Sequence, residues 1–553
     1  MRNYKLLGAL AAGCLAAFPL MSSRGTAAAA PAVAAERLGV VAFPVSCAAS
    51  VQTPFNRGVA LLHDFWYEEA RPQFERILKS DPRCSMAHWG IAMSVFHQIW
   101  DRPDEAARAA GWRELEAAET HPAKTARERE YIAALAEFFR PGPKAYEARI
   151  EAYSSAMEKL YAGYPGDVDA GAFYALSLLA VEAPTDTSLK QERAAMTLLM
   201  PLWDKHPDHP GLVHYIIHAC DNPSLAAEGL AAARAYGKVA PSGPHAVHMP
   251  GHIFSRLGLW PEDIAANTAS VEASRAAEAR HENGWMDQFH SDDFLVYAYL
   301  QSGQEAKARA IAEEANTAIA HYETMPDMSP DHYMTGMFPY YRMKLPIFVG
   351  LETREWATVL EVEPVNNAPA ETRTQVYWAR AIAAGHLHRA VEAQKDLGAY
   401  DALIEEMRRG PLAYVADGTA AKIRRGEIRA WSAFAEDKME DALARMRESA
   451  DLQDKVGQGE VDIPAREMLA DMLLETKRPA EALVEYQQAL KLSPNRFNGL
   501  YGAGMATETA GDPAAARRYY TALLKSTGDG ARSTRPEIAH AKTFVSTATL
   551  GKD

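Results

Sequence analysis

A 34-residue period in the C-terminal part of the chain restricts the fold more than any other sequence feature. Small and aromatic residues recur at this interval: Ala470, Ala482 and Tyr486 are followed by Gly504, Ala516 and Tyr520. The same internal offsets separate three residues near the N-terminus: Gly58, Ala70 and Phe74. Two antiparallel helices approach closely only where small residues occupy the crossing point, and an aromatic ring then fills the gap to the next repeat. The period therefore predicts stacked helix pairs.

The remainder of the chain also has a helical pattern. Apolar residues recur at helical spacing between loop glycines such as Gly258 and Gly303, and β-branched runs are few. Pro82 and Pro494 follow the second helices of two predicted pairs, where proline stops a helix. No convincing strand pattern is found. We expect an all-α fold.

The repeat spacing resembles the tetratricopeptide repeat (TPR) superfamily, most strongly over residues 51–100 and 463–526. Residues 45–310 further resemble a group of exported bacterial TPR proteins, in the segments FNRGVALLHDFWYEEARPQFERILKSDPRCSMAHWGIAMS, RERE before YIAALAEFF, and APSGPHAVHMPGHIFSRLGLW. The resemblance implies an α-solenoid, a superhelix of antiparallel helix pairs with a concave groove. It brings no assigned activity.

Proline pairs suggest where the array is interrupted. Pro141 with Pro143, and Pro326 with Pro330, break helical patterns. We expect five segments: a signal peptide at 1–35, N-terminal TPR-like repeats at 36–140, central repeats at 141–325, a helical repeat region at 326–460, and C-terminal TPR repeats at 461–553.

The first residues predict export. Arg2 and Lys5 precede an apolar run at 6–20, and an alanine-rich tract at 27–35 offers cleavage sites for a signal peptidase. This run is too short to span a bilayer comfortably, and no later apolar run is longer. We expect a periplasmic or secreted protein without a transmembrane segment. Lipidation at Cys14 is an alternative, although Ala11 stands where leucine is preferred.

Net charge limits the possible partners, and the cysteines fit an oxidising compartment. A formal net charge of −14 argues against a nucleic-acid binder, because neutralising phosphates requires a basic surface. In an oxidising compartment Cys47 and Cys84 are a plausible disulfide. Cys220 would then remain as a small buried residue, which is favoured over a metal ligand.

Six of the 18 histidines fall on neighbouring repeats. His214 and His218 are followed after 34 residues by His248 and His252, with His245 just upstream. A longer step of 45 residues aligns His290, Asp293 and Tyr297 with the same frame. The TPR resemblance implies that these positions line the concave face.

Imidazoles at this spacing suit a transition metal. Residues i and i+4 share one helical face, with Cβ atoms about 5–6 Å apart, so two imidazoles can bind one ion. Histidine with carboxylate favours zinc, copper or iron, and Asp221 or Asp293 could hold an imidazole in one tautomer. The segments HYIIH and HMPGH lack the glutamate of a helical metalloprotease, which excludes that enzyme class.

Two alternatives stay open for these side chains. The six histidines could form a stacked structural ladder without metal. His63 and His97, also 34 residues apart, could pack between helices or extend the groove as a stacking surface for a peptide or small ligand.

Two functional hypotheses therefore follow. One is an exported scaffold whose groove receives a peptide or cell-envelope protein and carries a metal-capable site. The other is a metal-dependent enzyme or transition-metal carrier that uses the same histidines. The sequence does not decide between binding and catalysis, and it names neither the metal nor the small-molecule ligand.

Overall fold

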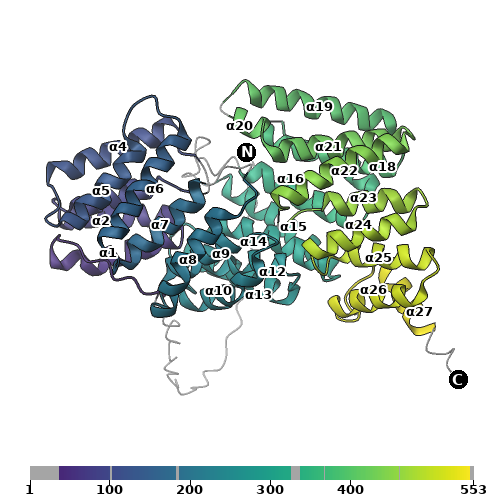
Figure 1. The fold of residues 1–553 in the computed structure, drawn as a ribbon, viewed down its shortest axis with the longest axis horizontal. Helices are drawn as coiled ribbons and strands as arrows, with labels where there is room; N and C mark the ends of the chain where they lie inside the picture. The colour runs from purple at the N-terminus through teal and green to yellow at the C-terminus, as the bar shows by residue number, and fades with distance from the viewer. Residues whose placement is uncertain are drawn as a thin grey trace, which may run out of the picture. The chain divides into compact units, whose positions relative to one another are not determined.

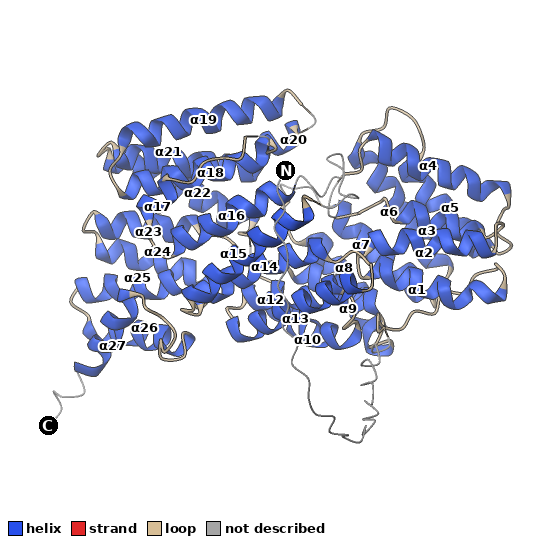
Figure 2. Ribbon diagram, turned by 180° about the vertical axis from the view of Figure 1, so that it is seen from behind, coloured by secondary structure: helices blue, strands red, loops and turns tan. Residues whose placement is uncertain are grey.

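The computed structural model describes residues 36–99, 102–181, 186–324, 337–366, 368–410, 412–459 and 461–547. Every regular element in these ranges is helical, as the sequence predicted, and Figure 2 shows helices joined by loops. The predicted signal segment at 1–35, Cys14, and the prolines at 326 and 330 lie outside the described residues.

The first part of the chain forms a short 3-10 helix and eight α-helices. Their bounds are η1 (Ala49–Val51), α1 (Gln52–His63), α2 (Tyr67–Ser80), α3 (Ser85–Met93), α4 (Glu105–Thr120), α5 (Ala126–Phe139), α6 (Tyr146–Gly163), α7 (Val168–Val181) and α8 (Lys190–Lys205). The RERE segment begins α5, where Glu128 and Thr125 form a capping box and Glu128 also accepts from the Ser46 backbone N–H.

The central part carries the histidines. Its helices are α9 (Pro210–Cys220), α10 (Ala226–Val239), α11 (Pro244–His248), α12 (Pro250–Arg256), α13 (Trp260–Ala279), α14 (Trp285–Gln301) and α15 (Glu305–Tyr322). Proline is the first residue of α9, α11 and α12, where its missing N–H leaves no helical bond unmade.

The last part completes the array. Its helices are α16 (Met337–Glu352), α17 (Trp356–Leu360), α18 (Ala370–His386), α19 (Ala390–Arg408), α20 (Ala413–Ala416), α21 (Thr419–Ala435), α22 (Met439–Val456), α23 (Ala465–Glu475), α24 (Pro479–Leu492), α25 (Phe497–Thr509), α26 (Pro513–Ser526) and α27 (Pro536–Thr547).

Every α-helix packs against its successor, and many also pack against the helix after that, for example α7 with α9, α12 with α14 and α16 with α18. Figure 1 shows this order as a colour sequence, from the purple helices near the N-terminus to the yellow helices near the C-terminus. This arrangement of successive helix pairs is an α-solenoid. No helix in the described ranges is long and apolar enough to cross a membrane.

The small and aromatic positions of the repeat meet as the 34-residue period predicted. A Cβ added at Gly504 would lie 2.3 Å from Tyr520, and one at Gly58 would lie 2.7 Å from Phe74. Phe74 also lies against Gly90 of the next pair. Only glycine allows these helix backbones to approach the rings so closely, so the spacing of each pair is set at these contacts.

Two distant parts of the chain meet at the buried side chain of Arg496. Its guanidinium donates to Glu352 and Glu467, both at 2.8 Å, and to the Tyr297 hydroxyl at 2.6 Å. The neighbouring Asn495 backbone carbonyl accepts from the Trp260 indole N–H at 2.9 Å. The loop between α24 and α25 is thereby held against α13 and α14.

The predicted disulfide is confirmed. Cys47 and Cys84 are bonded, and the bond joins the segment before α1 to the start of α3. Cys220 is buried as a free thiol, and burial raises its pKa to about 12, so it stays protonated. The largest apolar cluster extends from Leu38 to Ala277, and a second extends from Trp260 to Ala506. The borders between the five predicted segments remain predictions.

We predict that Gly504→Ala shifts the urea midpoint of unfolding downward by an amount equivalent to about 1–3 kcal/mol, because the added methyl group must displace Tyr520. The matched control is Gly398→Ala in α19, where a Cβ meets nothing within 4 Å. This control should stabilise by about 0.5–1 kcal/mol through helix propensity. An unchanged midpoint for Gly504→Ala would contradict the close approach of α25 and α26.

We predict that Glu427 makes stability depend on pH. Burial raises the pKa of Glu427 to about 7, although Arg424 lies beside it. The folded protein therefore holds a proton that the unfolded chain releases near pH 4.5, and stability from this group falls as the pH rises from about 4.5 to 7. Glu427→Gln should remove this decrease, which we expect to be on the order of 2–3 kcal/mol.

The measurement is the free energy of unfolding from pH 5 to 8. Glu440→Gln serves as the control because this side chain is 87% exposed. The explanation fails if Glu427→Gln and Glu440→Gln change the pH profile equally.

Candidate metal centre

Two groups of three histidines lie in the central helices. The first group combines two residues of α9 with one of α11: His214, His218 and His245. The second combines one residue each of α11, α12 and α14: His248, His252 and His290. Within each group one nitrogen of every ring lies within 4.8 Å of the others. The structure thus brings together the six predicted histidines as two sets, and the rings of His245 and His248 are 5.9 Å apart between them.

Each group is built on a pair of histidines one helical turn apart. His214 and His218 lie on α9, with ring centroids 4.7 Å apart. His248 and His252 lie on either side of Met249, where α11 ends and α12 begins, and their rings are 4.9 Å apart. Met249 at this junction keeps right-handed helical backbone angles, so His248 and His252 remain one helical turn apart.

The first pair is oriented from outside by a backbone carbonyl. His214 donates through Nδ1 to the His63 carbonyl at 2.6 Å, so its Nε2 faces inward. The Nε2 atom of His218 lies 3.0 Å from the Nε2 atom of His214. His245 completes the group, with its ring 5.1 Å from that of His214, and its Nδ1 lies 3.4 Å from the Asp287 carboxylate.

The second pair is oriented in the same way by side chains. His248 donates through Nδ1 to the Asn267 amide oxygen at 2.6 Å, and the Asn267 amide N–H donates to Asp263 at 2.6 Å, which fixes the amide orientation. His252 donates through Nδ1 to Asp221 at 2.8 Å. The two Nε2 atoms are then 2.9 Å apart, and the His290 ring lies 4.3 Å from that of His248.

The facing Nε2 atoms of His248 and His252 require a positive charge between them. A neutral imidazole carries one N–H proton. In both rings that proton must be on Nδ1, because the Asn267 amide oxygen and the Asp221 carboxylate only accept hydrogen bonds. Two lone pairs would otherwise face each other at 2.9 Å. Two nitrogens bound to one ion at about 2.0–2.1 Å, with angles between square and tetrahedral, lie about 2.9–3.4 Å apart. The spacing therefore fits a metal ion bound by both Nε2 atoms. The alternative explanation is one proton shared between these two nitrogens.

One phenylalanine packs against each group. Phe65 has its ring centroid 4.4, 5.4 and 5.7 Å from those of the first three histidines. Phe294 lies 4.7, 4.8 and 5.5 Å from those of the second three. Burial lowers the pKa of His214 and of His245 well below the ordinary value, so both are neutral at pH 7. Neutral imidazole is the form that binds metals.

Carboxylates around the groups have different electrostatic environments. Burial alone would raise the pKa of Asp221, but Arg256 and His252 outweigh this effect and hold that pKa below its ordinary range. Burial raises the pKa of Asp263 and of Asp287 well above the ordinary value. Asp221 is therefore the ionised partner of the second group.

A polar cavity of about 390 Å³ reaches the edge of this region. It is lined by His218 and Asp221 at the end of α9 and by residues 453–458 at the end of α22. Arg256 donates to both Asp221 and the Gln458 carbonyl, so the C-terminal part of the chain closes this side of the site. His218 and His290 are half-buried, whereas the other four histidines are buried. The cavity gives solvent or a small ligand a route to the first group.

The remaining predicted site residues have other contacts. Asp293 forms an ion pair with Lys344, and Tyr297 bonds with Arg496 and the Asp462 carbonyl. His63 is fully buried and holds His214 through its backbone carbonyl. His97 donates to the Ser94 carbonyl and lies against Tyr67.

Sequence reasoning missed the residues that orient or cover the rings: Phe65, Asn267, Asp287 and Phe294. Asn267 and Phe294 lie on the helices that follow or contact the histidine helices, but no spacing rule connects them to a given ring. Gly251 gives one signal, because a Cβ there would lie 2.6 Å from the Asn267 amide nitrogen. A small residue on a histidine helix therefore marks a close partner on the neighbouring helix without naming it.

Comparison with a family model supports one repeat in the C-terminal part of the chain. Residues 463–496, which contain the whole of α23 and α24, match the tetratricopeptide repeat family model. Among solved structures, the human IFIT1 dimer with m7Gppp-AAAA is similar at 10% identity, over 80% of this chain and 90% of that chain, with a TM-score of 0.35. The search of curated proteins found no match. With the helix packing above, the chain is an all-α solenoid that contains a tetratricopeptide repeat.

We predict that the metal-free protein carries a proton on Nδ1 of His214, His248 and His252, because a carbonyl, amide or carboxylate oxygen accepts from each. Long-range ¹H–¹⁵N NMR spectra of the chelator-treated, ¹⁵N-histidine-labelled chain measure this. His97 is the internal control, since it donates through Nε2 and should show the opposite pattern. Protons on Nε2 alone for His248 and His252 would contradict the orientation argued above.

Proposed function

We propose that this protein is an exported helical-repeat binding protein that holds two transition-metal ions, one in each group of three histidines. The observation that supports this most is the pair of Nε2 atoms at 2.9 Å in His248 and His252, with both Nδ1 atoms occupied by acceptors. A similar Nε2 spacing of 3.0 Å recurs one repeat earlier at His214 and His218, where the His63 carbonyl accepts from Nδ1 of His214. This repeated spacing supports one ion in each group.

The donor set favours zinc, copper or iron. Three imidazoles without thiolate suit these ions, and three protein ligands leave a position open for water or a further ligand. Outward hydrogen bonds to ring nitrogens are the usual means by which proteins orient metal-binding histidines, and their loss typically weakens metal binding about 10–100-fold. Asn267 and Asp221 supply two such bonds here.

The repeat scaffold supports a protein partner as well. Tetratricopeptide and related solenoids commonly bind peptides or other proteins on their helical surfaces, and a cell-envelope protein fits an exported chain. The Cys47–Cys84 disulfide is consistent with an oxidising compartment such as the periplasm.

A catalytic role is the second candidate, and the cavity at His218 and Asp221 favours it. An open metal position beside a cavity of about 390 Å³ could bind water or substrate, as catalytic metal sites require. A metal carrier would use the same ligands but would not need the cavity. Blocking the cavity should therefore affect only metal uptake in a carrier, whereas in an enzyme it should also abolish turnover of a substrate.

The experiment is metal analysis of the purified mature chain after dialysis against metal-free buffer. We expect the His248→Ala, His252→Ala variant to lose one equivalent of bound metal relative to the parent, and the His214→Ala, His218→Ala variant to lose another, because each pair supplies two of three ligands.

The matched control is His88→Ala, His121→Ala, since neither residue belongs to a group of potential ligands in the described residues. It should keep the parent's metal content. The proposal is wrong if the parent retains no metal after loading with Zn²⁺ or Cu²⁺, in which case a shared proton separates the Nε2 atoms. Equal losses in all three variants would also contradict it, because they would indicate unfolding.

A further inference from the structure

A third set of potential ligands lies outside the two histidine groups. His63 at the end of α1, Asp169 at the start of α7 and His209 just before α9 are all buried. We propose that these three residues form a separate site for one divalent transition-metal ion, with open coordination positions toward a cavity of about 670 Å³ beside them. Neither the proposed function nor the comparisons assign a role to this place.

The ligand spacing supports the site. The Nε2 atom of His63 lies 2.9 Å from Oδ1 of Asp169, and the Nε2 atom of His209 lies 3.3 Å from the same oxygen. Ligand atoms bound to one ion at about 2.0–2.2 Å with angles near 90–105° lie about 2.9–3.4 Å apart. Both spacings fall in this range.

The His63 ring is held firmly in place. Its Nδ1 atom lies 2.9 Å from the Tyr215 hydroxyl, which leaves Nε2 toward Asp169. Phe173 stacks on the ring with centroids 4.4 Å apart. Gly211 also lies so close that an added Cβ would be 2.3 Å from Nδ1, so only glycine allows this packing. An imidazole held by these three contacts loses little further freedom when it binds an ion.

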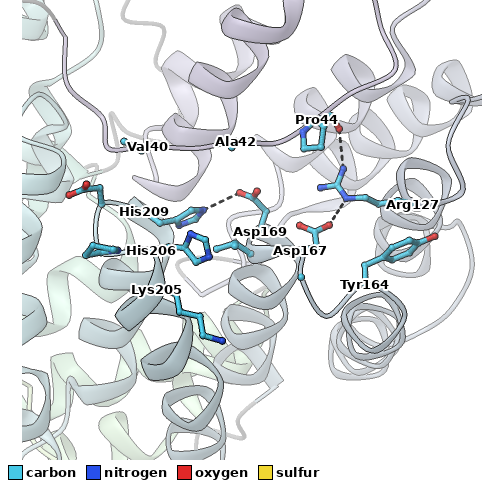
Figure 3. A pocket seen from close by; sticks show the side chains of 14 residues that line it. Val40, Ala42, Pro44, Arg127, Tyr164, Asp167, Asp169, Lys205, His206 and His209 are labelled. Carbon is cyan, nitrogen blue, oxygen red and sulfur yellow. Dashed lines mark hydrogen bonds and ion pairs between the residues drawn. The ribbon is translucent and has the colours of Figure 1, made fainter.

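His209 connects this set with the cavity. Its side chain is 5% exposed and lines the cavity together with Asp169, as Figure 3 shows. The Nδ1 atom of His209 is buried and makes no hydrogen bond to any residue that the structure describes. A buried imidazole nitrogen at a cavity wall is costly unless a ligand or water pairs with it. A molecule bound in the cavity would lie against His209 and Asp169, next to the proposed ion.

The donor set separates this site from the two histidine groups. Two histidines and one carboxylate are typical of iron(II) sites with open positions, and the carboxylate also suits manganese(II). Three imidazoles without a bound carboxylate suit copper and zinc better. We therefore assign Fe²⁺ or Mn²⁺ to this site. Apolar side chains cover much of the cavity wall, including Val40, Ala42, Pro44 and Val168, so the cavity favours a ligand with an apolar body.

The test is a Mn²⁺ titration of the full chain after chelator treatment, with free Mn²⁺ measured by electron paramagnetic resonance. We expect the parent to bind one Mn²⁺ at least about tenfold more tightly than Asp169→Asn does, because the variant loses the one carboxylate among the three proposed ligands. The control Asp208→Asn should bind Mn²⁺ like the parent, because this exposed residue lines the same cavity but lies outside the set.

Two further variants keep the result decisive. Circular dichroism shows whether Asp169→Asn folds. If it does not fold, His209→Gln takes its place as the test and should also weaken Mn²⁺ binding. The His248→Ala, His252→Ala variant should still bind Mn²⁺ at the third site. A loss of Mn²⁺ binding in Asp169→Asn is therefore separate from a loss of metal in the two histidine groups. Equal Mn²⁺ binding by the parent, Asp169→Asn and His209→Gln would overturn the proposal and leave a hydrogen-bonded His–Asp–His cluster.

Discussion

The close approach of glycine backbones to aromatic rings is the constraint on which the rest of this structure depends. Gly58 and Gly90 lie against Phe74, and Gly504 lies against Tyr520. Contacts of this kind fix the distance between paired helices, and repeating them fixes the step between pairs. Side chains 34 residues apart then occupy equivalent places on neighbouring helices, and the two histidine pairs have similar ring separations of 4.7 and 4.9 Å.

The orientation of the imidazoles depends on a second layer of contacts from other helices. The His63 carbonyl, Asn267 and Asp221 each accept from an Nδ1 atom and turn the opposite nitrogen inward. His63 has two roles in this arrangement, since its carbonyl holds His214 while its ring lies beside Asp169. The histidine groups and the third proposed site are therefore joined through one residue of α1.

Contacts between distant segments decide how open the region is. Arg256 links Asp221 to the Gln458 carbonyl. Arg496 links α16 and α23 through buried ion pairs and α14 through a hydrogen bond to Tyr297. Removing one partner of a buried, hydrogen-bonded ion pair leaves an uncompensated charge, so such links resist opening. They also place the end of α22 at the cavity beside His218.

The sequence by itself determined the helical class, the 34-residue step, the Cys47–Cys84 disulfide as a plausible pair, and the grouping of six histidines, because these depend on spacing along the chain and on repeat geometry. It did not determine that the six would separate into two sets, that Asp293 would bond with Lys344, or that His63 would meet Asp169 and His209. Those outcomes depend on which side chains from distant helices fill the space around each ring. Only tertiary packing fixes that choice, since no periodic rule relates residues 63, 169 and 209.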